Sequence, residues 1–416
     1  MKSGRLPWTA WGDLTVQSDM NNGFDPARLA RIRSWMQDHV SAGRLAGLAV
    51  QIARRGEVAF SGQVGNRDAE AGTPVTPDTI WRIFSMTKPV TSLAALMLYE
   101  EGAFQLDQPL SDFLPEFANA RVWQGDGHPL TATEPAHRAI TIHDLMTHQA
   151  GLVYGDAGGN ELERALAASG LDLERGFANM AEAVEALARF PLGFQPGSRW
   201  FYGLSTDVLG RMIEVLSGKS LGDFLHQRIF APLGMIDTGF AVSKDKVGRL
   251  ATLYDHAQEG FVRAADQDSC IAPVTLESGG GGLVSTMTDY QRFATMLLHR
   301  GAFPGGHLLG RKTFDLMVSN HMGGDLASRG QGHFSETTFE GIGFGLGVSV
   351  MLDPTRAKIT GSPGEFAWGG MASTAFWVDP VEEMTVILMT QLVPSSAYTL
   401  RRQLRVLSYA ALIGDR

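Results

Sequence analysis

The chain has 416 residues, of which 44% are hydrophobic and 19% charged, and its formal net charge is -9. This length and composition can supply a large core and indicate one compact globular unit. The acidic balance, with no run of basic residues, disfavours nucleic acid and anionic membranes as partners. The first 13 residues lack a charged start followed by an apolar stretch, and no apolar run reaches about 18 residues. We therefore expect a soluble cytoplasmic protein without a signal peptide.

Cysteine and histidine carry little sign of metal or disulfide chemistry. Cys270 is the only cysteine, which excludes a disulfide framework and a thiolate metal cluster. A role as a nucleophile stays open, but a small buried side chain is the favoured interpretation. His143 and His148 are five residues apart, off the spacing of a helical metal-binding pair, and no His-Glu-x-x-His occurs. We interpret both histidines as structural.

The N-terminal part of the chain predicts a helix followed by a β-hairpin. Asp25 and Pro26 begin the helix, whose apolar residues Leu29, Ile32, Met36 and Val40 recur at helical spacing. Residues 46–53 and 57–64 alternate as strands do, and a tight polar turn at residues 54–56 joins them.

Ser85 and Lys88 lie where a strand-like run, residues 80–84, gives way to an apolar helix over residues 86–99. Pro89 falls in the first turn and Gly102 follows the last, as helix bounds require. Residues three apart share a helix face, so we expect the Lys88 ammonium beside the Ser85 hydroxyl at the positive end of the helix dipole. A serine hydroxyl needs an adjacent base or an electropositive setting to attack a carbonyl, and a buried lysine can supply either.

The Ser-x-x-Lys spacing by itself has low specificity. It recurs at Ser243 and Lys246, where no helical pattern follows. The alternative interpretation of the first pair is that Ser85 only caps a helix and Lys88 extends to the surface. We favour the catalytic interpretation because of the motifs that follow downstream.

The remainder of the chain predicts helices in the middle and strands near the C-terminus. Residues 110–270 read as mainly helical or irregular, and the glycines at 279–282 suit a turn or a close backbone approach. Without a βαβ unit, those glycines are not interpreted as a nucleotide loop. Strand patterns return over residues 344–352, 366–378 and 384–391, with a turn at residues 379–382 and a closing helix over residues 396–413.

Strands at both ends of the chain with helices between them indicate an α/β fold of the α+β type. We expect a central antiparallel sheet flanked by helices. Residues 1–109 and 271–416 would form this sheet domain, and residues 110–270 a mainly helical inserted domain.

Two further motifs give the chain a family resemblance. Tyr202 lies in a turn-forming stretch that leads into an amphipathic helix, and this stretch resembles the Tyr-Ser or Tyr-x-Asn element of serine β-lactamases and penicillin-binding proteins. Trp368-Gly369-Gly370 is similar to the edge-strand box of that superfamily, usually Lys-Thr-Gly, which is Trp-Gly-Gly in family VIII carboxylesterases. Segments 141–152, 229–238 and 282–286 also look like segments of this group. The motifs follow the expected order, so the chain resembles family VIII carboxylesterases, with a fold like that of class C β-lactamases.

The resemblance implies a role for each motif. Ser85 would be the acylated nucleophile, and Lys88 and Tyr202 would share the base and acid roles. An adjacent ammonium favours a phenolate, so a tyrosine-lysine couple can accept and return the serine proton. The backbone N–H groups of Ser85 and Met371 would form the oxyanion hole. The resemblance implies no metal and no cofactor.

Departures from the β-lactamase pattern bear on the substrate. Trp368 replaces the lysine that helps bind a drug carboxylate, and Leu204 stands where many lactamases have an asparagine that hydrogen-bonds the lysine and the substrate amide. Trp368, Gly369, Gly370 and Leu204 would therefore line a site for small-molecule esters with short acyl groups. The prediction is a carboxylesterase.

Other functions stay open or are excluded. Weak β-lactamase or DD-peptidase-like activity and acyl transfer to an alcohol remain alternatives. A catalytically silent penicillin-binding-like protein that recognises an acyl compound or peptide is the non-enzymatic alternative. An α/β-hydrolase is disfavoured because the Gly-x-Ser-x-Gly pentapeptide of the chain, residues 218–222, does not lie between a predicted strand and a helix.

Overall fold

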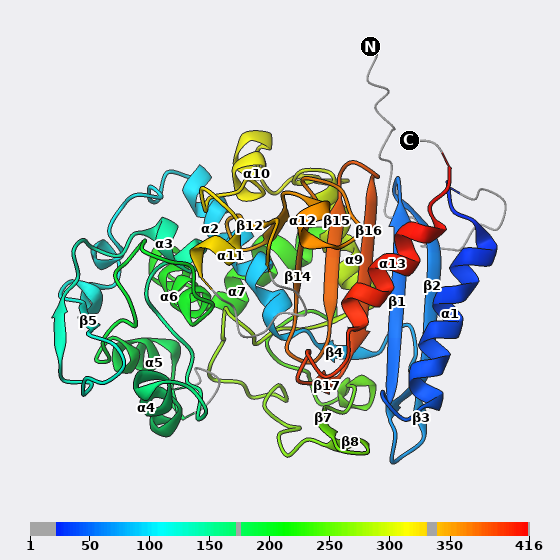
Figure 1. Ribbon diagram of the computed structural model, residues 1–416, viewed down its shortest axis with the longest axis horizontal. Helices are drawn as coiled ribbons and strands as arrows, with labels where there is room; N and C mark the ends of the chain where they lie inside the picture. Colours follow the sequence, from blue (N-terminus) through cyan, green and yellow to red (C-terminus); the bar gives the residue numbers. More distant parts are fainter. Residues whose placement is uncertain (1–21, 172–175, 331–338, 415–416) are drawn as a thin grey trace, which may run out of the picture.

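The computed structural model describes residues 22–171, 176–330 and 339–414. The first 13 residues, assessed above for a signal peptide, lie outside these ranges. Figure 1 shows strands of one large sheet in the centre, a lobe of helices and loops to one side, and two long helices on the other. No helix among the described residues is long and apolar enough to cross a membrane.

The central sheet is antiparallel throughout, as the sequence predicted. Its strand order is β12-β13-β14-β15-β16-β1-β2-β3. N- and C-terminal parts of the chain join where β1 pairs with β16, from Leu48 opposite Thr390 to Arg54 opposite Met384. The strands are β1 (Gly47–Arg54), β2 (Glu57–Asp68), β3 (Thr73–Pro74), β12 (Ile342–Phe344), β13 (Ser349–Met351), β14 (Phe366–Gly369), β15 (Ala375–Asp379) and β16 (Met384–Thr390).

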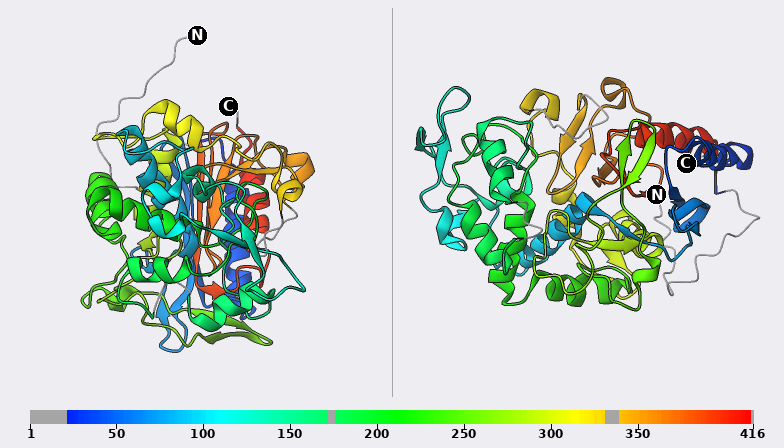
Figure 2. Two further views of the ribbon diagram at one scale, coloured as in Figure 1. Left: turned by 90° about the vertical axis from the view of Figure 1, so that its left-hand side faces the viewer. Right: turned by 90° about the horizontal axis from the view of Figure 1, so that it is seen from below.

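Helices cover both faces of this sheet. On one face α1 and α13 lie side by side, and on the other α2 and α9 separate the sheet from the helical lobe (Figures 1 and 2). The sheet therefore has two hydrophobic cores, and every residue of β1 is buried between them. The helices are α1 (Pro26–Ser41), α2 (Thr87–Glu100), α3 (Ile142–Met146), α4 (Glu161–Ser169), α5 (Met180–Leu187), α6 (Ser205–Ser217), α7 (Leu221–Leu225), α8 (Ala231–Leu233), α9 (Met287–Leu298), α10 (Arg311–Met317), α11 (Leu326–Arg329), α12 (Pro354–Ala357) and α13 (Leu400–Ala411).

Short strands complete the fold. β7 and β8, within the range predicted to be helical or irregular, pair with each other, and β7 also pairs with β17 near the C-terminus. The short strands are β4 (Ile80–Arg82), β5 (Arg121–Trp123), β6 (Thr133–Pro135), β7 (Tyr254–Ala257), β8 (Gly260–Arg263), β9 (Val284–Thr286), β10 (Ala302–Phe303), β11 (Gly306–His307) and β17 (Leu392–Val393). A domain division at residues 110 and 270 stays a prediction.

Two segments that were each predicted as a single strand form two strands in the structure. Residues 344–352 were predicted as one strand, but Phe344 ends β12 and a turn with Gly347 at φ 92 leads into β13. Residues 366–378 were also predicted as one strand, and here β14 and β15 form a hairpin whose turn holds Ser373 at φ 69. A positive φ favours glycine and reverses the chain, which periodicity of apolar residues does not reveal. The closing helix likewise begins at Leu400 instead of residue 396.

Candidate active site

Ser85 lies in a single 3₁₀ turn, Phe84–Met86, between β4 and α2. The preceding residue, Phe84, has φ 44, a conformation that non-glycine residues seldom adopt and that concentrates at functional sites. The Tyr290 hydroxyl holds the turn by donating to the Met86 carbonyl oxygen at 2.9 Å. The helix thus begins within two residues of Ser85, close to where Pro89 and the apolar run predicted it. Ser85 is half-buried and lines a cleft.

Lys88 is fully buried on the first turn of α2 and reaches Ser85. Its Nζ lies 3.3 Å from the Ser85 Oγ, the contact that the three-residue spacing predicted. Nζ also donates to the Tyr154 hydroxyl at 2.9 Å and to the Gly280 carbonyl oxygen at 2.6 Å. An ammonium group has three N–H donors and no acceptor, so these contacts use its full set.

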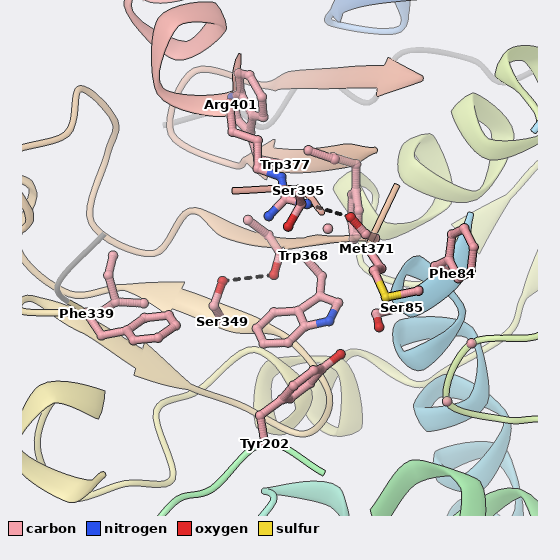
Figure 3. A pocket seen from close by; sticks show the side chains of 18 of the residues that line it. Phe84, Ser85, Tyr202, Phe339, Ser349, Trp368, Met371, Trp377, Ser395 and Arg401 are labelled. Atoms are coloured by element: carbon pink, nitrogen blue, oxygen red, sulfur yellow. Dashed lines mark hydrogen bonds between the residues drawn. The ribbon is translucent and has the colours of Figure 1, made fainter. Parts of the chain in front are cut away.

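Tyr202 closes the other side of the lysine. The Lys88 Nζ lies 4.7 Å from the centroid of the Tyr202 ring, a cation–π distance. The Tyr202 ring packs against His148 at 4.9 Å and Trp368 at 5.4 Å between centroids. Figure 3 shows its phenol directed toward Ser85 across the cleft. Tyr202, which is distant in the sequence, therefore meets Ser85 and Lys88 at one place.

Tyr154 is a site residue that the sequence analysis missed. Its hydroxyl contacts the Lys88 Nζ more closely than the Ser85 Oγ does, and its ring lies 5.5 Å from that of Tyr202. Tyr154 follows the 141–152 segment by two residues. This closeness to a family-like segment was the one sequence signal that could have pointed to Tyr154. A single tyrosine in a loop is, however, a weak indication of a site residue.

Trp368, Gly369 and Gly370 border the cleft at the end of β14, and Figure 3 shows the Trp368 ring beside Tyr202. Trp368 pairs with Phe376 of β15, and the Gly370 N–H donates to the Thr374 carbonyl oxygen at 2.9 Å. In an antiparallel ladder alternate residues bond to opposite sides. The register therefore directs the polar backbone groups of Gly369 away from β15.

Both glycines lie close to backbone oxygens. A Cβ on Gly369 would lie 2.9 Å from the Thr374 carbonyl oxygen, and a Cβ on Gly370 would lie 2.3 Å from the Ile83 carbonyl oxygen. The second contact joins the end of β14 to the residues just before Ser85. Gly370 thus lets the end of β14 approach the serine turn.

The cleft has a volume of about 360 Å³. Trp200, Tyr202, Phe339 and Trp368 supply aromatic walls, and α13 contributes Arg401, Arg402 and Arg405. Met371 lines the cleft and is exposed, but Leu204 is buried in the core and is not among the lining residues. Leu204 was expected to touch substrate, and the structure instead gives it a packing role at the start of α6.

Two buried ionisable groups lie beside the site. Burial, together with the Lys88 charge, holds the pKa of His148 well below its usual 6.5, so this imidazole is neutral. Burial raises the pKa of Asp207 above its usual 3.8, while the Lys88 charge and hydrogen bonds from Ser278 and Gly280 oppose that rise. His143 lies apart from His148, hydrogen-bonded to His321 at 3.1 Å. Cys270 is buried, as expected, and the pKa of its thiol is raised by burial.

The sheet, the helical lobe and the Ser-x-x-Lys turn define a fold of the serine β-lactamase and penicillin-binding-protein superfamily. The chain belongs to the β-lactamase family, whose model, described as Beta-lactamase, matches residues 32–411. Esterase EstB of Burkholderia gladioli is 34% identical over 384 residues, covering 88% of this chain and 91% of its own. Protein Rv1367c of Mycobacterium tuberculosis is also 34% identical, over 361 residues, covering 85% and 87% of the two chains. The solved structure of EstCE1, described as a hydrolase with promiscuous acyltransferase activity, superposes with a TM-score of 0.77 at 27% identity, covering 93% of this chain and 99% of its own.

Proposed function

We propose that this protein is a serine hydrolase of small-molecule carboxylic esters, of the family VIII carboxylesterase type. The observation that carries the proposal is the Lys88 Nζ, which bridges the Ser85 Oγ at 3.3 Å and the Tyr154 hydroxyl at 2.9 Å beneath the Tyr202 ring. This is a nucleophile held beside a cation and two phenols. Such a set can remove the serine proton and return it.

In the proposed acylation, the Ser85 Oγ attacks the ester carbonyl carbon and its proton passes to a tyrosinate, for which Tyr202 is the candidate. The backbone N–H groups of Ser85 and Met371 would stabilise the oxyanion of the tetrahedral intermediate. Collapse of the intermediate breaks the ester bond, and the tyrosine returns the proton to the departing alcohol. Water then attacks the acyl-enzyme by the same proton route, which releases the acid and restores Ser85.

The walls of the cleft favour uncharged esters. Trp368 presents an aromatic surface where an ammonium would be needed to hold a drug carboxylate, and its ring packs on Tyr202 and Phe344 at 5.4 and 5.3 Å. An apolar wall of this kind supports binding by burial of acyl or alcohol carbon. The name of EstB, an esterase, agrees with this substrate class.

Acyl transfer to an alcohol is the second candidate. EstCE1, described as a hydrolase with promiscuous acyltransferase activity, supports it. The acyl-enzyme is common to both reactions, so the acceptor that reaches Ser85 decides between them. Weak β-lactamase activity is a third outcome that the same assay can detect.

The test is labelling of the purified protein with a fluorophosphonate, followed by turnover of p-nitrophenyl esters from acetate to palmitate beside nitrocefin. We expect one label per chain and release of p-nitrophenol, both lost in Ser85→Ala. Ser243→Ala is the matched control, since Ser243 has the same Ser-x-x-Lys spacing but is exposed, and it should label fully. Absence of labelling in the unmodified protein would favour the acyl-binding or peptide-binding alternative.

A further inference from the structure

Asp207 is a buried carboxyl group next to the proposed catalytic residues. It stands on the first turn of α6, five residues after Tyr202, and is only 1% exposed. Its Oδ1 accepts hydrogen bonds from the Ser278 hydroxyl at 2.5 Å and from the Gly280 N–H at 3.0 Å. The helix that follows Tyr202 therefore also anchors the glycine-rich segment 279–282.

Gly280 connects this carboxyl group to Lys88. Its N–H donates to Asp207 and its carbonyl oxygen accepts from the Lys88 Nζ at 2.6 Å, the shortest of the lysine's three contacts. A Cβ on Gly280 would lie 2.2 Å from the Asp207 Oδ2, so only glycine fits here. The Thr91 hydroxyl fixes the neighbouring Gly279 carbonyl oxygen to α2 at 2.8 Å. The segment that the sequence marked for close backbone approach thus links Asp207 to the lysine.

The charges around Lys88 also give Asp207 a role. The ionisable groups facing the lysine are Tyr154 and Tyr202, the neutral imidazole of His148, and Asp207. Asp207 is the carboxyl group among these. A buried ammonium is costly unless an opposite charge lies nearby and its N–H groups are bonded. Both conditions hold for Lys88 when Asp207 is ionised.

We propose that Asp207 is a positioning residue, which fixes the Gly280 carbonyl oxygen and supplies the counter-charge that keeps Lys88 an ammonium. This proposal rests on the function proposed above. With the lysine charged in the resting enzyme, a tyrosine and not the lysine accepts the Ser85 proton. The ammonium then favours the tyrosinate and the negative serine oxygen. The hydrogen bonds from Ser278 and Gly280 hold the Asp207 carboxylate in place beside this charged group.

The test compares Asp207→Asn with Asp207→Ala. Asparagine keeps an acceptor for Ser278 and Gly280 but removes the charge, whereas alanine removes both. Without the negative charge of Asp207, the ammonium of Lys88 is less stable. The tyrosinate is more stable, because it no longer has a second negative charge nearby. We expect both limbs of the pH profile of kcat/KM to move to lower pH in Asp207→Asn by about one unit, with KM nearly unchanged. Asp207→Ala should lose about tenfold more in kcat than Asp207→Asn.

Two further variants test the role of the charge. Asp223→Asn changes an exposed aspartate on α7 and should leave the profile unchanged. Ser278→Ala removes one of the hydrogen bonds that oppose the raised pKa of Asp207, so both limbs should move in the same direction as in Asp207→Asn, but by less. Identical pH profiles for the unmodified protein and Asp207→Asn would overturn the proposal.

A readout independent of activity distinguishes this proposal from the proposed function. The 13C chemical shift of the Lys88 Cε reports whether the amine carries its third proton. In Asp207→Asn we expect Lys88 to lose that proton at lower pH than in the unmodified protein. An unchanged Lys88 titration refutes the Asp207 role even if esters are cleaved. A shifted titration supports the Asp207 role even if Ser85 proves unreactive toward the fluorophosphonate. That lack of reaction would contradict only the proposed hydrolase function.

Discussion

The Lys88 Nζ lies 2.9 Å from the Tyr154 hydroxyl and 3.3 Å from the Ser85 Oγ. Tyr154 is therefore the closest phenol partner that the structure gives this lysine, while Tyr202 presents its ring to the same nitrogen at 4.7 Å. Both tyrosines contact the same lysine, and mutation can resolve which of them accepts the proton in the proposed mechanism.

The first prediction separates the two tyrosines. Tyr202→Phe should lower kcat by about 100-fold or more, the loss expected when acid–base assistance is removed. Tyr154→Phe should lower kcat by only about tenfold, because Lys88 loses one hydrogen bond but keeps the other two. Steady-state kinetics on p-nitrophenyl acetate checks both. A deeper loss in Tyr154→Phe than in Tyr202→Phe would transfer the proton-accepting role to Tyr154.

The second prediction concerns the close approach of β14 to the serine turn. In Gly370→Ala the new Cβ would lie 2.3 Å from the Ile83 carbonyl oxygen, which is too close. The Gly370–Met371 peptide or the serine turn must therefore move. We expect kcat to fall by about 10²-fold, as for loss of one oxyanion donor, with a modest fall in stability. Gly248→Ala is the matched control, since a Cβ there meets nothing within 4 Å. Equal activity in both variants would contradict the role given to this contact.

The third prediction concerns Trp368. Removing its ring in Trp368→Ala opens the wall shared with Tyr202 and Phe344 and should raise KM by about tenfold, since an apolar wall contributes roughly 1–3 kcal/mol. The acyl-chain preference should broaden while kcat changes little. Ile236→Ala, at a side chain that is 77% exposed, provides the control. A loss of kcat as complete as in Ser85→Ala would instead assign Trp368 a part in the chemistry.

The fourth prediction concerns a cluster at the C-terminal end of α13, which should make the free energy of unfolding depend on pH. The Tyr409 hydroxyl lies 2.6 Å from the Glu365 Oε2 and 2.7 Å from the Asp379 Oδ2. One phenolic proton cannot serve two carboxylates, so this cluster favours a proton on a carboxyl group. Burial raises the pKa of Glu365 above its usual 4.5, with Arg405 opposing.

The sign of the effect follows from that raised pKa. Below 4.5 the folded and unfolded chains both hold the Glu365 proton, so its contribution is fully present there, and it is lost as pH rises through the raised folded value. Urea unfolding from about pH 5 to about pH 8 should therefore show a fall in the free energy of unfolding that is absent in Glu365→Gln. Glu185→Gln, an exposed control, should retain the wild-type slope. Parallel curves for the unmodified protein and Glu365→Gln would contradict the prediction.

Local sequence determined the elements whose cause is local. The helical period of Leu29, Ile32 and Met36 predicted α1, and these side chains are buried against the sheet. The three-residue spacing of Ser85 and Lys88 predicted their contact, because neighbours on a helix face meet whatever surrounds them. The motif order predicted the superfamily, since each motif is short and continuous.

Tertiary structure decided the contacts between distant segments. Tyr154, Asp207 and Gly280 meet Lys88 or its carbonyl partner from three separate stretches of chain, and no spacing within the sequence encodes that meeting. The turn at Gly347 splits a predicted strand because a positive φ, and not apolar periodicity, reverses the chain. Leu204 looked like a substrate contact and proved to be core, since its direction depends on how α6 packs. Sequence by itself therefore determined the contact of Ser85 with Lys88 and the helix that carries it, through short-range geometry, whereas the groups that surround this pair depend on long-range packing.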